Sequence, residues 1–127
     1  MRKRAGASTV EPIRDPEKIR EMKEYLLHKS YRDYFLFTFG INSGLRISDI
    51  LLLRAMDVTH TTHLKVREQK TGHIRKVKMP SALQNEIERY THRMAPSDFL
   101  FPSRQGDKPI SRVQAWNIIN EAAREAG

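Results

Sequence analysis

The residues most able to do chemistry are one arginine and one carboxylate, Arg46 and Asp49, set in a stretch that otherwise has the composition of a buried core. Burying an arginine without a partner is costly, so we expect its guanidinium to meet a carboxylate, a carbonyl or an anionic ligand. The i,i+3 spacing would place Asp49 on the same face of a helix. Two interpretations stay open: a structural Arg–Asp pair, or a phosphate-binding arginine whose guanidinium is oriented by Asp49.

The element that must position these side chains is a helix packed on a core. Apolar residues recur after Arg46 at helical spacing. Gly44 suits the end of the preceding helix, where a positive φ is expected. The apolar residues of the predicted helix are Ile47, Ile50, Leu51 and Leu53.

A second candidate element follows, with the period of a strand. Residues 64–68 alternate between apolar and polar side chains, as in a strand. Residues 70–73 have the composition of a turn, and residues 74–79 are expected to form the returning strand. This pattern predicts a β-hairpin that is rich in basic residues. The alternative is a solvated edge hairpin whose lysines only prevent aggregation. His60 and His63 lie in an expected loop without a third ligand nearby, so we expect no metal site.

The remaining segments predict helices joined by loops. Asp15 followed by Pro16 has the composition of a helix start, and this helix should end near residues 29–30. Further helices are predicted over residues 31–42, from Pro80 to before residue 96, and after Ser111. In the last helix, the side chains expected to face the core are Val113, Trp116, Ile119 and either Ile118 or Ala122.

These elements define the expected fold class and its boundaries. Residues 1–14 should form a basic flexible tail, and residues 95–110 a loop whose apolar residues 99–101 enter the core. We expect an α+β fold that is mainly α-helical, with a small antiparallel β-hairpin or three-stranded sheet. A chain of 127 residues with 39% hydrophobic composition is long enough for a single core.

Composition also limits the classes of partner. The formal net charge is +8 and the sequence pI is about 10.0, which favours a polyanion through counterion release. The absence of cysteine excludes disulfides and fits a reducing cytoplasm. No apolar run approaches the roughly 18 residues of a membrane-spanning helix, and no signal peptide is recognisable. An RNA-binding or ribosome-associated protein is another class that this charge allows.

Four segments resemble, in order and with ordinary spacing, the tyrosine recombinases of the phage integrase family. Gly44-Leu45-Arg46-Ile47-Ser48-Asp49-Ile50-Leu51, followed by Leu53-Arg54, resembles the first-arginine motif of that family. Residues 68–72 resemble the hairpin that carries the catalytic lysine, and residues 76–80 resemble its returning strand. Residues 99–103 and 108–111 resemble the segments before the next long helix. The resemblance implies that residues 15–127 are roughly the N-terminal two-thirds of an integrase catalytic domain, an incomplete DNA breaking-rejoining fold.

The resemblance implies a role for each matching residue. In this family a tyrosine attacks a DNA phosphodiester and forms a 3′-phosphotyrosyl link, which a second DNA end later reverses. Arg46 matches the arginine that binds the non-bridging oxygens, Lys70 matches the lysine that protonates the leaving 5′-oxygen, and Asp49 would orient Arg46. No metal or other cofactor is implied, because arginines stabilise the developing charge. The residues expected to contact DNA are Arg67, Lys70, Thr71, His73, Arg75 and Lys76.

The family pattern also contains motifs that do not occur here. A His-x-x-Arg motif and the tyrosine nucleophile follow the family's helix that resembles residues 113–126, whereas this sequence stops at Gly127. His92-Arg93 lies too far upstream to be that motif. We expect packing or surface roles for the tyrosines, which all precede the expected nucleophile: Tyr25, Tyr31, Tyr34 and Tyr90.

The expected activity follows from these motifs. We expect this chain alone to bind double-stranded DNA without cutting it, as part of a parent enzyme of DNA integration and site-specific recombination. The alternative is a non-catalytic DNA-binding regulator or relic on the recombinase scaffold. Such enzymes commonly work as tetramers on DNA. We also expect a cytoplasmic, nucleoid-associated protein and self-association through exposed apolar surface.

Overall fold

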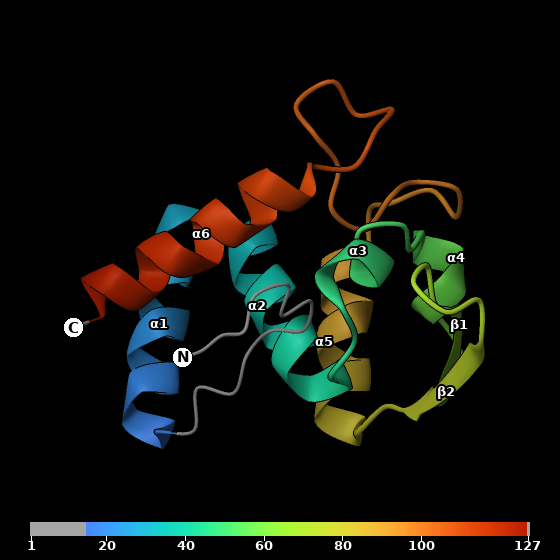
Figure 1. Cartoon of the computed structure of the whole chain (residues 1–127), viewed down its shortest axis with the longest axis horizontal. Helices are drawn as coiled ribbons and strands as arrows, with labels where there is room; N and C mark the ends of the chain where they lie inside the picture. Colours follow the sequence, from blue (N-terminus) through green and yellow to red (C-terminus); the bar gives the residue numbers. More distant parts are fainter. Residues whose placement is uncertain (1–14, 127) are drawn as a thin grey trace. The chain divides into compact units, whose positions relative to one another are not determined.

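In the computed structural model of the chain, residues 15–126 are described, so the expected tail at residues 1–14 lies outside them (Figure 1). The chain divides into two compact units. Among the described residues, the first combines residues 15–47 with residues 112–126, and the second is the continuous stretch 48–111.

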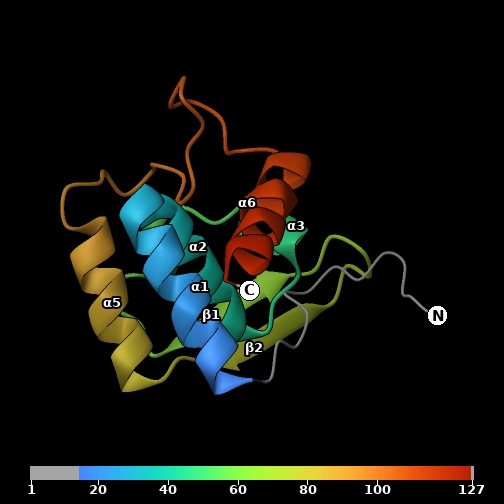
Figure 2. The same cartoon turned by 90° about the vertical axis from the view of Figure 1, so that its left-hand side faces the viewer.

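The first unit is built from three helices that pack on one another. They are α1 (Pro16–Lys29), α2 (Tyr31–Ser43) and α6 (Arg112–Glu125), and α1 contacts both of the others (Figure 2). The buried apolar side chains of these three helices are Met22 and Leu26 of α1, Phe35, Leu36, Phe37 and Phe39 of α2, and Ala115, Ile119 and Ala122 of α6. The first two helices begin and end within a residue of their predicted bounds.

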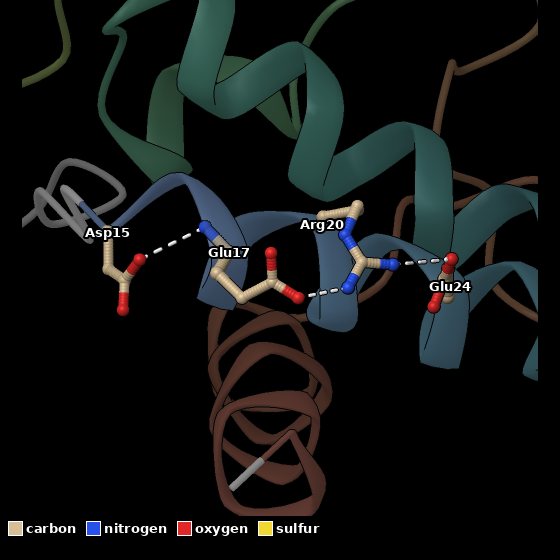
Figure 3. A network of polar contacts seen from close by, with 4 residues as sticks. All are labelled: Asp15, Glu17, Arg20 and Glu24. Carbon is tan, nitrogen blue, oxygen red and sulfur yellow. Dashed lines mark hydrogen bonds and ion pairs between the residues drawn. The ribbon is translucent and has the colours of Figure 1, made fainter.

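The ends of these helices follow ordinary capping rules. Asp15 caps α1 by accepting a hydrogen bond from the Glu17 amide at 3.0 Å. Figure 3 shows this cap and, one turn on, Arg20 between the carboxylates of Glu17 and Glu24. Gly44 ends α2 with φ of 67°, so its predicted left-handed conformation is confirmed.

Polar side chains join α1 to α6. The Tyr25 hydroxyl donates a hydrogen bond to the Glu121 carboxylate, and Lys29 Nζ lies 3.2 Å from Glu121 Oε2. The hydrogen bond from Tyr25 and the nearby Lys29 ammonium lower the pKa of Glu121. The same carboxylate raises the pKa values of Tyr25 and Lys29.

The predicted inward face of the last helix was wrong at one position. Val113 is 69% exposed, whereas the buried stripe of α6 starts at Ala115 and continues through Ile119 and Ala122. Because successive helical residues turn by about 100°, a residue two positions before Ala115 points to the opposite side. Trp116 and Ile118 are half-buried.

The second unit combines a two-stranded sheet with helices. After α3 (Ile47–Ile50), which starts at the last residue of the first unit, come α4 (Ala55–Val58), β1 (His63–Arg67), β2 (Ile74–Lys78) and α5 (Ser81–Thr91). β1 and β2 pair antiparallel as a two-stranded sheet (Figure 2). The predicted hairpin is confirmed, and the described residues contain no third strand of this sheet.

The helix predicted after Arg46 is shorter than expected. All four of its apolar residues are buried, but α3 ends at Ile50 because the following backbone pairs with a distant loop. The Leu100 amide donates to the Leu53 carbonyl at 2.9 Å, and the Ala55 amide donates to the Asp98 carbonyl at 2.9 Å. The Arg54 guanidinium also lies over the Phe99 ring, 4.1 Å from its centroid. The chain then forms α4, a helix that the sequence analysis did not predict.

Candidate functional site

The hairpin β1–β2 has two unlike faces. Its register places Lys65 opposite Lys76 and Val66 opposite Arg75, and side chains alternate between the faces along each strand. Leu64 and Val66 are buried, so their face is turned to the core of the second unit. The other face is exposed and carries His63, Lys65, Arg67, Ile74, Lys76 and Lys78.

The exposed hairpin face, defined by those six residues, has an unbalanced charge. Four of the six side chains are lysine or arginine and none is acidic. Like charges directly opposite each other on a sheet repel, which is the arrangement of Lys65 and Lys76. An anion bound over this face would relieve the repulsion.

The register separates the residues that the sequence had grouped as DNA contacts. Arg67 and Lys76 lie on the exposed hairpin face, whereas Arg75 lies on the opposite one, with Nη1 3.9 Å from the Glu68 carboxylate. Sequence reasoning passed over Lys65 and Lys78, which share the face of Arg67 and Lys76. The two-residue alternation within each strand could have identified them.

The turn between the strands is held by its own hydrogen bonds. The Glu68 amide donates to the His73 carbonyl at 2.8 Å, and the Gly72 amide donates to the Glu68 carbonyl at 2.8 Å. Thr71 Oγ1 donates to the Glu68 carboxylate at 2.9 Å and accepts from the His73 amide at 3.1 Å. Gly72 has φ of 77°, a conformation that favours glycine. These bonds define a single shape for residues 68–73.

Lys70 stands in the middle of this turn. It is exposed, and its ammonium has no hydrogen-bond or ion-pair partner among residues 15–126. The turn therefore presents a lysine whose backbone is fixed and whose side chain can reach a ligand.

Arg46 belongs to the first unit, where it follows the end of α2. It is half-buried between two fully buried neighbours, Leu45 and Ile47. The Leu45 amide donates to Ser43 Oγ at 3.2 Å. Buried residues on both sides fix the backbone from which the guanidinium projects.

Asp49 belongs to the second unit and has a partner that the sequence did not predict. The residue is 2% exposed, and its Oδ1 accepts a hydrogen bond from the Gln69 amide at 2.9 Å. The expected i,i+3 relation to Arg46 required both residues on one helix, but α3 begins only at Ile47. A shallow pocket of about 240 Å³ lies beside Asp49 and is also lined by Gln69, Lys65 and Arg67.

The described tyrosines all make packing contacts. Tyr31 and Tyr34 stack with ring centroids 5.8 Å apart, and the Tyr90 hydroxyl donates to the Leu100 carbonyl at 2.5 Å. Within residues 15–126 no three His, Cys, Asp or Glu side chains are grouped so that they could hold a metal ion. No helix in this part of the chain has the length and apolar character needed to cross a membrane.

The sequence is similar to those of known proteins over most of its length. Residues 15–127 match the model of the phage integrase family. The chain is 52% identical over 118 residues to the probable integrase/recombinase YoeC of Bacillus subtilis, covering 93% of this chain and 65% of the relative. It is 28% identical over 115 residues to the tyrosine recombinase XerA of Pyrococcus furiosus, covering 87% of this chain and 40% of the relative.

A solved structure agrees with the fold. The crystal structure of XerA recombinase superposes with a TM-score of 0.72 and 19% identity, covering 89% of this chain and 42% of the XerA chain. The chain therefore spans between 40% and 65% of the length of these two curated relatives.

Proposed function

Because the chain belongs to the phage integrase family, we propose that it is the DNA-binding part of a tyrosine recombinase that acts in DNA integration and site-specific recombination. The parent enzyme would cut and rejoin DNA through a 3′-phosphotyrosine intermediate. The observation that carries the proposal is the exposed hairpin face, where Lys65 and Lys76 are held opposite each other without an acid on that face. A DNA backbone supplies the regularly spaced negative charge that this face lacks.

We propose that Arg46 and Lys70 have the catalytic roles that the family resemblance implies. A tyrosine oxygen bonds to phosphorus while the bond from phosphorus to the 5′-oxygen breaks. Arg46 would donate to the non-bridging oxygens, for which its planar fork of permanently charged donors is suited. Lys70 would protonate the leaving 5′-oxygen, and its exposed ammonium on a fixed turn supports this role.

The DNA contacts can be ranked by their place on the hairpin. Arg67 and Lys76 share the exposed hairpin face with Lys65 and Lys78, and we propose that all four follow the phosphate backbone. Lys70, Thr71 and His73 would contact DNA from the turn. Arg75 is the weakest of the expected contacts, since it lies on the other face near Glu68.

Salt-dependent binding to a DNA duplex tests this interface. We expect Lys65→Gln combined with Lys76→Gln to reduce the slope of log affinity against log salt by about 2, because each phosphate contact contributes about 0.9. Arg93→Gln combined with Lys108→Gln removes the same charge from exposed positions outside the hairpin and serves as the control. Equal slopes for both double variants would contradict binding through this face.

A covalent adduct assay tests the chemistry on the full product of the gene. We expect a DNA–protein adduct with a half-site duplex selected from random sequence, and its loss in Arg46→Ala. Lys70→Ala should slow the reaction about 10²–10⁴-fold. A bridging 5′-sulfur, which leaves without a proton, should restore the rate for Lys70→Ala and leave Arg46→Ala inactive. A gene product that binds duplex DNA but never forms an adduct would instead be a DNA-binding regulator.

We also propose that the protein self-associates and that the parent enzyme works as a tetramer on DNA. Sedimentation velocity over a range of protein concentrations, with and without duplex DNA, measures both. A monomer that persists at every concentration would contradict self-association.

A further inference from the structure

The bond between Asp49 and Gln69 ties the Lys70 turn to α3. We propose that Asp49 is a positioning residue for Lys70, acting through the Gln69 amide, rather than a residue that serves Arg46 alone. This inference rests on the proposed function for the role of Lys70, but the bond itself is a feature of the free protein.

The first support is the directness of the connection. Asp49 Oδ1 accepts from the Gln69 amide at 2.9 Å, and Gln69 immediately precedes Lys70. A hydrogen bond to the backbone fixes the position from which the lysine side chain starts. A hydrogen bond to a side chain would restrain that position far less.

The second support is the burial of the carboxylate. Asp49 is 2% exposed, and its other oxygen, Oδ2, is buried without a hydrogen-bond partner among residues 15–126. A buried carboxylate loses the solvation that water would give, so it holds a remaining donor firmly. The Gln69 amide is the donor that the described structure supplies, and the bond is charge-assisted.

The third support is the construction of the turn. The bonds between Glu68, Thr71, Gly72 and His73 fix its internal shape, but they leave its orientation on the second unit to other contacts. Asp49 supplies such a contact from outside the hairpin. Without it, we expect the turn to keep its shape and to pivot about the ends of β1 and β2.

Amide exchange in the free chain tests the bond without DNA. In Asp49→Ala we expect the Gln69 amide to exchange about tenfold faster or more, while the amides of Leu64 and Val66 in β1 keep their protection. Asp49→Asn retains a side-chain oxygen of the same reach and should restore most of the Gln69 protection. Unchanged Gln69 exchange in Asp49→Ala would refute the bond. Loss of protection throughout the second unit would show a general packing role and would also overturn the proposal.

The positioning of Lys70 is tested by adduct formation in the full gene product. If Asp49 acts through Lys70, the bridging 5′-sulfur substrate should restore Asp49→Ala as it restores Lys70→Ala, and Asp49→Ala should add little to the defect of Lys70→Ala. If Asp49 acts only through Arg46, the sulfur substrate will not restore it, and the proposal fails. Absence of any adduct with the unmodified protein would refute the proposed function, whereas the exchange experiment would still decide whether the bond exists.

Discussion

Gly72 determines whether the turn around Lys70 can keep its shape. Its φ is 77°, and a Cβ added there would meet nothing within 4 Å. The only penalty for alanine is therefore the backbone conformation. We expect Gly72→Ala to lower the free energy of unfolding by about 1 kcal/mol in urea denaturation.

Asparagine provides the matched comparison at this position, because it tolerates the left-handed conformation better than alanine does. Gly72→Asn should therefore lose less stability than Gly72→Ala. Equal stability of all three proteins would mean that residue 72 can leave its positive φ without consequence.

Single residues also show where the sequence sufficed and where it did not. Asp15 and Gly44 act on their own neighbours, so their cap roles could be predicted from adjacent residues. The partner of Asp49 is 20 residues away at Gln69, and it donates a backbone amide, which every residue other than proline possesses. No side-chain pattern marks such a donor.

At the scale of the element, α1 depends on its cap more than on its surface ion pairs. We expect Asp15→Ala to lower the free energy of unfolding by about 1 kcal/mol, since the Glu17 amide loses its acceptor (Figure 3). Asp15→Asn, which keeps an acceptor, should lose much less. Urea denaturation measures both variants.

The ion pairs of Arg20 provide a contrasting prediction on the same helix. Its side chain is 54% exposed and both carboxylates are 62% exposed, so solvent weakens the attraction. Arg20→Gln should change stability by less than about 0.5 kcal/mol, and the change should shrink in 1 M salt. An effect larger than that of Asp15→Ala would contradict this ranking.

Repulsion between Lys65 and Lys76, which lie opposite each other, should lower the stability of the hairpin in the free protein. Removing either lysine of the Lys65–Lys76 pair should raise the stability of the free protein by a few tenths of a kcal/mol at low salt. A double-mutant cycle with Lys65→Gln and Lys76→Gln isolates the pair. We expect a repulsive coupling that disappears in high salt, and an attractive coupling would contradict the opposed arrangement.

The elements that were mispredicted have non-local causes. Local periodicity identified the buried residues after Arg46, but it could not show that the backbone near Leu53 pairs with residues 98–100. Local periodicity also did not identify α4, whose first two amides donate to the carbonyls of Asp98 and Pro96. For α6, the sequence showed an amphipathic helix, and only the packing of the first unit shows that Ala115 rather than Val113 begins the buried stripe.

At the scale of the whole molecule, Glu121 makes the stability of the first unit depend on acid. Its pKa is lowered in the folded protein, so its contribution is complete above the ordinary carboxyl pKa of about 4.3 and is lost as pH falls through the lowered value. We expect Glu121→Gln to be less stable than the unmodified protein at pH 7. In thermal denaturation the two should converge as the pH falls through that lowered pKa.

Asn120→Asp places a carboxylate at the neighbouring exposed position of α6 and serves as the control for acid effects in general. A stability difference for Glu121→Gln that is the same at every pH would show that lost packing, rather than lost charge, causes it.

The division of the first unit between distant segments has a consequence for how the chain is made. Tyr25 and Glu121 are 96 residues apart in sequence, whereas residues 48–111 form one continuous unit. At a synthesis rate of about 5–20 residues per second, the 82 residues that follow α2 and end with the last residue of α6, Glu125, take about 4–16 s to be added. During this interval α1 and α2 lack the helix that packs on them, while the hairpin unit can already assemble. We therefore expect the nascent chain to carry a folded hairpin unit and an exposed apolar helix pair, the kind of surface that chaperones bind.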